Sequence, residues 1–290
     1  MTRSFREALD SGRFLVTAEF DSPKGTDVGM VMSAIKDVKD IVDAVGVADN
    51  PGAVMTMSPW ALCRVIAESG GEPIMHVSCR DRNRMALQSD LLGAAFLKIR
   101  NILCISGDHV SFGDHTDAMP VHDLDSIQLL EAVRDLTRGQ DMTGHPLQGM
   151  PEFCVGAVAN PEADPLQPQL FKFQKKIQSG VDFVVTHPVF NIDNLKPFLK
   201  EAREKKVKLL AGVRLLVSDE VPAYRDGSRP GLFVPENILA EIEGSGIDKG
   251  VEVAVRLIKS MKEKNLCDGV HILAPGHEEK IIDIIKAAGI

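Results

Sequence analysis

Eight apolar segments, each followed by a segment with helical spacing of apolar residues, constrain the fold of this 290-residue chain more than any other feature. Each apolar segment has no polar face, so it predicts a strand that is covered on both sides. The predicted strands are residues 14–20, 44–49, 73–78, 101–106, 153–159, 182–187, 207–216 and 269–274. The helical segments after them are residues 28–41, 59–69, 82–99, 124–138, 169–179, 193–205, 235–264 and 277–288.

Eight strand–helix alternations in a chain of this length predict an α/β fold, a closed (β/α)8 TIM barrel, rather than an open doubly wound sheet. A Rossmann dinucleotide domain would carry GxGxxG after a strand, and no predicted strand is followed by that motif. Neither a shift in composition nor a Ser/Gly linker marks a second domain. We therefore expect residues 1–290 to form a single barrel domain.

Charge and cysteine usage narrow the class of protein. The formal net charge of −8 argues against nucleic acid or an anionic membrane as the main partner. The five cysteines are scattered and form no CxxC pair, which is typical of free thiols in a reducing compartment. No segment approaches the ~18 apolar residues of a membrane span, and the N-terminus lacks the apolar centre of a signal peptide. These features predict a cytoplasmic protein.

Polar residues stand at the predicted carboxyl ends of the strands, where barrels of this class carry their chemistry. In chain order they are Glu19, Asp49, Asn50, His76, Ser78, Asp108, Asn160, Glu162, Thr186, His187, Arg214 and His271. A closed barrel would bring all of these side chains to one rim.

Glu19 lies between Ala18 and Phe20 in an otherwise apolar strand. Ionising a carboxyl group in such surroundings is costly, so its pKa is usually raised. A raised pKa would suit Glu19 to proton donation. The structural alternative is an inward glutamate that bonds a Lys or Arg in the bottom of the barrel.

The loop of residues 107–125 is rich in Asp and His, but it lacks a regular ligand spacing such as HxxxH. We therefore expect no metal and interpret the loop as a solvated, mobile lid over the barrel mouth. Lys172, Lys175 and Lys176 fall on adjacent helical turns. They either converge on a phosphate or form a solvated helix face.

Five sequence pieces, in order, resemble one known family: AEF at 18–20, MHVSC at 75–79, ISGD at 105–108, ANPE at 159–162 and KKIQSGVDFVVTHPVFNID at 175–193. Over roughly residues 3–289 the chain resembles the methylenetetrahydrofolate reductases, which are flavin-dependent (β/α)8 barrels. The resemblance implies an oxidoreductase of one-carbon metabolism. Its reaction would be the flavin-dependent reduction of 5,10-methylenetetrahydrofolate to 5-methyltetrahydrofolate.

The resemblance also implies roles for particular residues. Glu19 matches the acid that helps to open the methylene bridge, and Asp108 matches the aspartate that orients the pterin and tunes the flavin. His187 is expected to contact the substrate. The residues expected to bind the cofactor are Asp49, His76, Gly107, Asn160, Lys172 and Lys176.

Three positions depart from the family pattern. His187 replaces a common Gln, Ser106 replaces a common Arg, and Asp164 stands at the position of a phosphate-side His. The last two departures remove positive charge near the flavin tail, so both FAD and FMN remain open. The usual electron donor is a reduced nicotinamide, NADH or NADPH, whereas some relatives in acetogens work with a partner electron-transfer subunit.

Two other functions remain open from the residues. One is a pterin-dependent methyltransferase barrel without flavin, in which Asp49 and Asn50 would hold the pterin. The other is a flavin- or folate-binding subunit that is active only with a partner electron-transfer subunit. The oligomeric state, homo- or hetero-, is also open.

Overall fold

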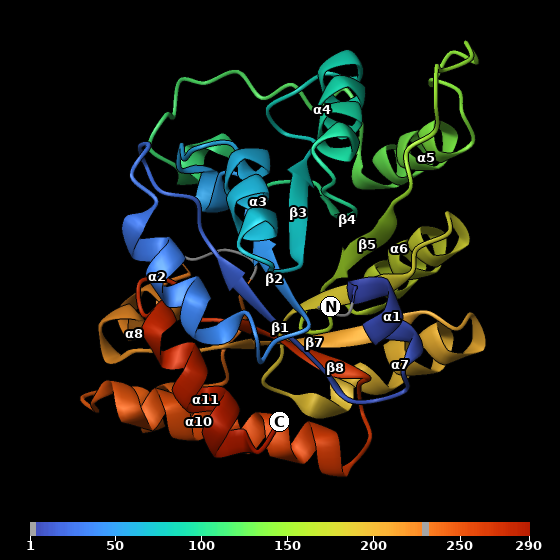
Figure 1. The fold of residues 1–290 in the computed structure, drawn as a ribbon. Coiled ribbons are helices and arrows are strands. Elements are labelled where there is room, and N and C mark those ends of the chain that lie inside the picture. The colour runs from blue at the N-terminus through green and yellow to red at the C-terminus, as the bar shows by residue number, and fades with distance from the viewer. Residues whose placement is uncertain (1–3, 228–231) are drawn as a thin grey trace.

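The computed structural model describes residues 4–227 and 232–290, and it confirms the predicted (β/α)8 barrel. All strands are parallel, and they close into a ring in which β8 pairs with β1 (Figure 1). The strands are β1 Leu15–Phe20, β2 Ala44–Val47, β3 Pro73–Ser78, β4 Asn101–Ile105, β5 Cys154–Ala159, β6 Phe183–Pro188, β7 Lys208–Arg214 and β8 Gly269–Leu273. Each predicted strand overlaps one of these.

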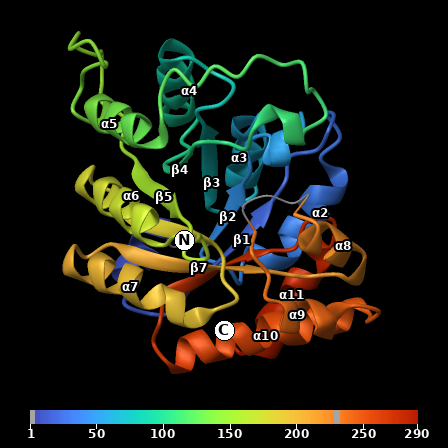
Figure 2. The same ribbon diagram turned by 180° about the vertical axis from the view of Figure 1, so that it is seen from behind.

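Helices surround the ring of strands on the outside, as the two opposite views of Figures 1 and 2 show. The predicted ones are α2 Gly29–Val38, α3 Pro59–Glu68, α4 Arg84–Phe96, α5 Ser126–Thr137, α6 Gln167–Gln178, α7 Leu195–Glu204 and α11 Ile281–Ala288. The segment predicted as 235–264 is two helices, α9 Glu236–Ile242 and α10 Ile247–Glu263. They are separated at Gly244, whose φ of 70° lies in the left-handed region. Two short helices were not predicted, α1 Phe5–Asp10 and α8 Val221–Arg225.

The amino end of the barrel is filled with apolar side chains. Phe5 of α1 packs edge-to-face on Phe183 of β6, with ring centroids 5.2 Å apart. Leu15, Ile74 and Leu103 belong to the same buried cluster. Burying a phenylalanine contributes about 1.5–3 kcal/mol to stability. Glu19, His76 and His271 line a cavity at the opposite, carboxyl end.

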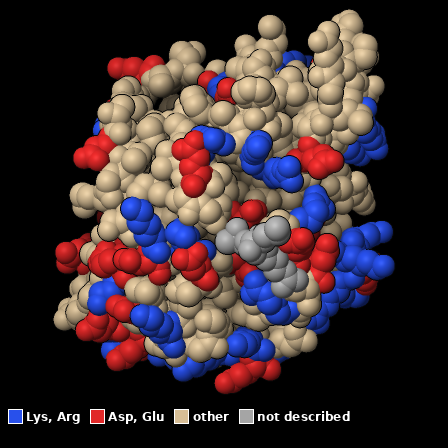
Figure 3. Space-filling model, in the orientation of Figure 1, with Lys and Arg blue, Asp and Glu red and all other residues tan. Residues whose placement is uncertain are grey.

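The surface carries charges of both signs. On the face drawn in Figure 3, Lys and Arg side chains lie beside Asp and Glu side chains. Ion pairs of this kind join Arg225 to Glu236 at 2.7 Å and to Glu243 at 2.6 Å. None of the helices within the described residues is long and apolar enough to cross a membrane.

Candidate active site

A cavity of about 440 Å³ lies at the carboxyl ends of the strands, a volume typical of small-molecule sites. Every residue that was expected to act in catalysis, in cofactor binding or in substrate binding lines it. They are Glu19, Asp49, His76, Gly107, Asp108, Asn160, Lys172, Lys176 and His187. The residues come from separate strands and connections that are distant in sequence. The closed barrel therefore brings together the side chains that the sequence could only place on one rim.

Glu19 meets two histidines in the barrel interior. Its Oε2 accepts a hydrogen bond from Nε2 of His271 on β8 at 3.0 Å, and Nε2 of His76 on β3 lies 3.7 Å away. The Glu19 side chain is 19% exposed, so a ligand in the cavity can reach it. On the far side of the His271 ring, Nδ1 lies 2.8 Å from Oγ1 of Thr17. The structural alternative, a Glu bonded to a Lys or Arg at the barrel bottom, does not describe this position.

The expected raised pKa of Glu19 is wrong. Burial alone would raise it, but the hydrogen bond from His271 and the charges of the two histidines and Arg214 together lower the pKa of Glu19 to about 2. The apolar neighbours of Glu19 are visible in the sequence. The groups that reverse the shift come from β3, β7 and β8, and only the fold brings them near.

Asp21 has the property that was expected of Glu19. Burial raises its pKa to about 7, and the negative charges of Glu19 and Glu278 add to the shift against the opposing charge of Arg214. Asp21 directly follows β1, and sequence reasoning missed it. Its position one residue beyond a strand that already held a candidate acid was the available signal.

His76 is almost fully buried, at 4% exposure, and burial lowers its pKa to about 4, against the opposing charge of Glu19. The ring is therefore neutral at pH 7. Its Nε2 is buried and has no hydrogen-bond partner among the residues that the structure describes. A Cβ atom on Gly46 would lie 3.2 Å from that nitrogen and 3.1 Å from Cε1 of His271. Glycine at position 46 thus leaves room for both rings.

Gly107 and Asp108 shape the mouth of the cavity after β4. Gly107 has φ 85°, and a Cβ atom there would lie 2.2 Å from Oγ of Ser78, so only glycine fits. The exposed Asp108 is held by a hydrogen bond from the backbone N–H of Gly52 to its Oδ2, at 3.0 Å. Asp108 itself lines the cavity.

A network from the connection after β3, which sequence reasoning missed, supports this rim. Arg80 is 2% exposed and donates to both carboxylate oxygens of Asp81 at 2.7 Å. It also donates to the main-chain oxygen of Asp108 at 3.1 Å. Asp49 accepts a hydrogen bond at 2.8 Å from the backbone N–H of Ser78 and pairs with Arg82 through the same oxygen. Asp49 thus lines the cavity and also anchors the loop.

The loop of residues 107–125, expected to be a mobile lid, is tied down at several points. Asp114 accepts from the backbone N–H of Met55 at 3.0 Å and pairs with Lys24. Asp123 forms an ion pair with Arg84 at 2.9 Å. These acidic side chains hold the loop to its neighbours, which accounts for much of the Asp content that drew attention to it.

Two lysines of α6 line the cavity and the third does not. Nζ of Lys176 donates to the main-chain oxygen of Val158 at 2.7 Å. Burial and the adjacent charge of Lys172 lower the pKa of Lys176 to about 8, so it remains mostly charged at pH 7. Lys175 instead lies over the Phe171 ring, 4.6 Å from its centroid. Lys172 and Lys176 therefore form the basic part of the wall.

The rim at β6 is fixed by Thr186. Its hydroxyl donates to the main-chain oxygen of His187 at 2.7 Å and accepts from the backbone N–H of Gly212 at 2.9 Å. The contact accompanies a shift in the β6–β7 register and leaves His187 exposed at the cavity edge. Glu162 accepts from two backbone N–H groups of the next loop, at Phe190 and Asn191, so it holds the loop.

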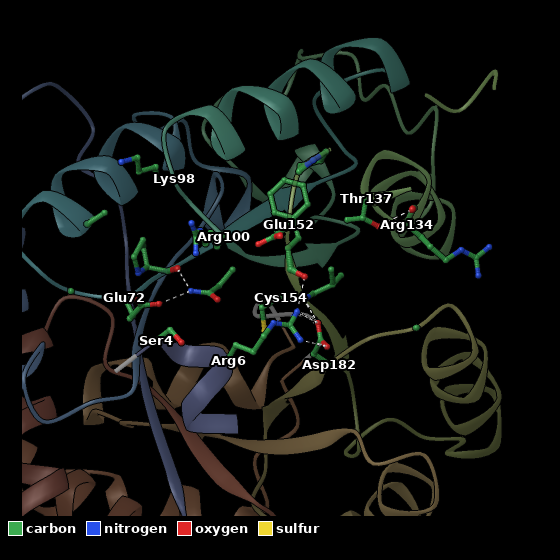
Figure 4. A pocket seen from close by; sticks show the side chains of 18 of the residues that line it. Ser4, Arg6, Glu72, Lys98, Arg100, Arg134, Thr137, Glu152, Cys154 and Asp182 are labelled. Atoms are coloured by element: carbon green, nitrogen blue, oxygen red, sulfur yellow. Dashed lines mark hydrogen bonds and ion pairs between the residues drawn. The ribbon is translucent and has the colours of Figure 1, made fainter. Parts of the chain in front are cut away.

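A larger cavity, of about 830 Å³, lies at the amino end of the barrel, away from these groups (Figure 4). There Arg6 of α1 forms an ion pair with Asp182 at 3.0 Å. Glu72 accepts from the backbone N–H of Phe5 at 3.2 Å and from the Asn101 amide at 3.2 Å. These groups attach α1 to the barrel, and in such barrels this end serves stability.

The carboxylate of Glu19 and the two imidazoles lie within 4.8 Å of one another, a spacing that a divalent cation could also bridge. The sequence placed the three residues on one rim, but it could not show that they meet, because they come from strands far apart in the chain. The 3.0 Å contact between Glu19 and His271 is already a hydrogen bond, which needs a proton between the two atoms. We therefore interpret the cluster as a proton-sharing pair with a neutral histidine beside it.

Residues 4–289 match the sequence profile of the family described as methylenetetrahydrofolate reductase. A "Probable methylenetetrahydrofolate reductase (NADPH)" of Caenorhabditis elegans is 20% identical over 245 residues, which is 81% of this chain and 35% of that protein. "Methylenetetrahydrofolate reductase 1" of Schizosaccharomyces pombe is 24% identical over 226 residues, 74% of this chain and 35% of that protein. The chain thus spans about a third of the length of these relatives.

Solved structures share the barrel at low identity. EDTA monooxygenase from Chelativorans sp. BNC1 superposes with a TM-score of 0.60 at 11% identity, over 96% of this chain and 94% of that one. Long-chain alkane monooxygenase superposes with a TM-score of 0.59 at 10% identity, over 95% and 90%. Similarity at identities this low shows a shared fold alone. The profile match over nearly the whole length is what identifies the family: this chain belongs to the methylenetetrahydrofolate reductases.

Proposed function

We propose that this chain reduces 5,10-methylenetetrahydrofolate to 5-methyltetrahydrofolate with a bound flavin. Family membership supports the reaction. The observation on this chain that supports the same reaction is that Glu19, His76, Asp108 and Lys176 line one cavity. These residues match the family's proton donor, flavin contact, pterin anchor and phosphate contact.

The residues of the cavity fit a flavin. His76 offers a buried Nε2 without a partner in the described part of the chain, which suits the polar edge of a ring system. Lys172 and Lys176 offer positive charge for a phosphate group. When bound, the flavin supplies the hydride chemistry, and the protein supplies orientation and electrostatics.

The protein's own groups then orient the folate and handle its proton. Asp108, held by Gly52, can accept hydrogen bonds from the N–H groups of a pterin through Oδ1. The exposed His187 at the β6 rim lines the same cavity and would contact the substrate there. Glu19 supplies the proton that opens the methylene bridge.

We propose FAD or FMN as the flavin and a reduced nicotinamide, NADH or NADPH, or a partner electron-transfer subunit as the electron source. Extraction of the cofactor and its mass distinguish the two flavins. Oxidation of NADH or NADPH by the isolated chain, compared with activity after adding co-purifying proteins, distinguishes the donors. A cytoplasmic location is supported by the five cysteines, which are all free and buried.

A spectrum and a rapid-mixing experiment test the proposal. The purified protein should be yellow, and the anaerobically reduced protein should re-oxidise when mixed with 5,10-methylenetetrahydrofolate. Glu19→Gln should abolish this re-oxidation while flavin stays bound. The surface variant Glu68→Gln, at a side chain 57% exposed, is the matched control. A protein that binds folate but no flavin would favour the pterin-dependent methyltransferase instead.

A further inference from the structure

The hydrogen bond between Glu19 and His271 is one link in a chain of contacts that runs into the barrel wall. Nε2 of His271 faces Oε2 of Glu19 at 3.0 Å, and Nδ1 faces Oγ1 of Thr17 at 2.8 Å. The same hydroxyl lies 3.2 Å from the main-chain oxygen of Val270, to which it can donate. His271 and Thr17 are 1% and 0% exposed. Both nitrogens of the ring are therefore held by protein groups, out of water.

These contacts restrict where protons can lie. A carboxylate and a bare ring nitrogen repel each other at 3.0 Å, so one proton must lie between Oε2 of Glu19 and Nε2 of His271. The Thr17 hydroxyl has a single proton. If that proton goes to Val270, Nδ1 of His271 must carry a proton and donate it to Thr17.

That arrangement has a chemical consequence. With Nδ1 protonated, the proton between Glu19 and His271 can leave while the ring stays a neutral imidazole. In the opposite arrangement Thr17 donates to Nδ1, and loss of the Nε2 proton would leave an imidazolate, which is prohibitive near neutral pH. The direction of the Thr17 hydrogen bond thus decides whether the pair can act as an acid.

We propose that Glu19 and His271 form a single proton donor, in which His271 stores the proton and Thr17 is a positioning residue that keeps the ring protonated at Nδ1. The proposal rests on the function proposed above. It explains how a carboxylate that is ionised in the resting site can still deliver a proton.

The proposed step breaks one bond of the folate and transfers one proton. The bond between the bridging carbon and the leaving nitrogen of the folate breaks, and its electron pair stays on that nitrogen. The proton shared by Oε2 of Glu19 and Nε2 of His271 passes from Oε2 to that nitrogen, which leaves Glu19 as a carboxylate and His271 as a neutral imidazole protonated at Nδ1. The substrate keeps an iminium carbon, which is the hydride acceptor of the proposed reaction. Solvent returns one proton to the pair after the product leaves.

The charged and titratable groups that face the pair come from three elements. They are His76 on β3, Arg214 on β7 and Asp21 after β1. Arg214 is itself bonded to Glu220 and to the Tyr224 hydroxyl, each at 3.0 Å. Variants at Thr17 leave all three facing groups in place, so they test the direction of the Thr17 bond by itself.

The first experiment observes the proton directly and needs no turnover. Two-bond ¹H–¹⁵N spectra of the flavin-loaded protein, without folate, report which ring nitrogens of each histidine carry a proton. The His271 signals are assigned by their loss in His271→Asn, and His145→Gln, at a side chain 79% exposed, is the control. We expect Nδ1 of His271 to be protonated at pH 7. A neutral ring with its proton on Nε2 alone would overturn the proposal, whatever the protein catalyses.

The second experiment measures the folate half-reaction of the anaerobically reduced protein against pH. His271→Gln should slow re-oxidation by about 100-fold, the lower range for loss of a general acid. Thr17→Val removes the acceptor of the Nδ1 proton, so the pH above which the rate falls should move down by about one unit. Thr17→Ser should restore the wild-type profile. An unchanged pH profile in Thr17→Val would overturn the proposal, whereas a wild type with no folate reduction at all would overturn the proposed function.

Discussion

Asp21 provides a test of the electrostatics at the barrel mouth that does not depend on catalysis. Its pKa of about 7 stands some three units above the ordinary 3.8, chiefly because of burial. At about 1.4 kcal/mol per unit, keeping Asp21 ionised in the folded protein costs up to ~4 kcal/mol. Partial exposure of the side chain reduces this to roughly 2 kcal/mol. Asp21→Asn, which cannot ionise, should therefore stabilise the protein at alkaline pH.

The direction of this change in stability with pH follows from the linkage between protonation and folding. The folded protein holds the Asp21 proton up to about pH 7, whereas the unfolded chain releases it near its ordinary pKa. Wild-type stability consequently falls as pH rises from about 4 to 7 and then levels off. The advantage of Asp21→Asn should be small at pH 4.5 and complete at pH 8.5.

Urea unfolding at the two pH values measures this difference, with thermal unfolding as a second readout. At pH 8.5 the melting temperature of Asp21→Asn should exceed that of wild type by roughly 4 °C, at about 2 °C per kcal/mol for a chain of this size. Asp117→Asn, at an exposed position on the loop after β4, is the matched control. Equal stability of Asp21→Asn and wild type at both pH values would refute the reasoning.

Three further predictions concern the site and the core. In urea unfolding, Gly107→Ala should lower the free energy of unfolding by about 1–3 kcal/mol more than Gly144→Ala does. Both glycines have φ near 85°, but only at Gly107 would a Cβ atom meet a neighbour, Oγ of Ser78 at 2.2 Å. Equal losses of stability in the two variants would contradict the clash. Lys176→Met should weaken flavin binding by about tenfold or more in fluorescence titration, and Lys175→Met, whose ammonium lies over Phe171, should not. The five buried cysteines should react with a thiol reagent only on unfolding, since burial raises the pKa of every one; rapid labelling of the native protein would argue against that burial.

The sequence predicted the barrel because strand apolarity and helix periodicity are local signals, and each of them repeats eight times. It also predicted which residues share the cavity, because a parallel barrel puts every strand's carboxyl end on one rim. Asp108 could be placed in this way without knowledge of any contact, whereas Lys176 lies on α6 and was assigned its role from the family resemblance.

The protonation state of Glu19 could not be predicted in the same way. It depends on His271, which lies 252 residues away in the chain, and, in the proposed arrangement, on the Thr17 hydroxyl that accepts from Nδ1 of the same ring. In the sequence, Thr17 is an ordinary strand residue. Arg80 was missed for a similar reason, since a loop arginine carries no local sign that it will be buried among carbonyl groups.

The packed amino end has a kinetic consequence. Phe5 and its neighbours fill the barrel axis at the amino end of the described residues, so a molecule that approaches Glu19 would enter and leave through the cavity at the carboxyl end. If a nicotinamide is the electron donor, it and the folate would share this opening and bind one after the other. Steady-state rates measured against both compounds should then give parallel lines in a double-reciprocal plot, which is the pattern of a ping-pong mechanism.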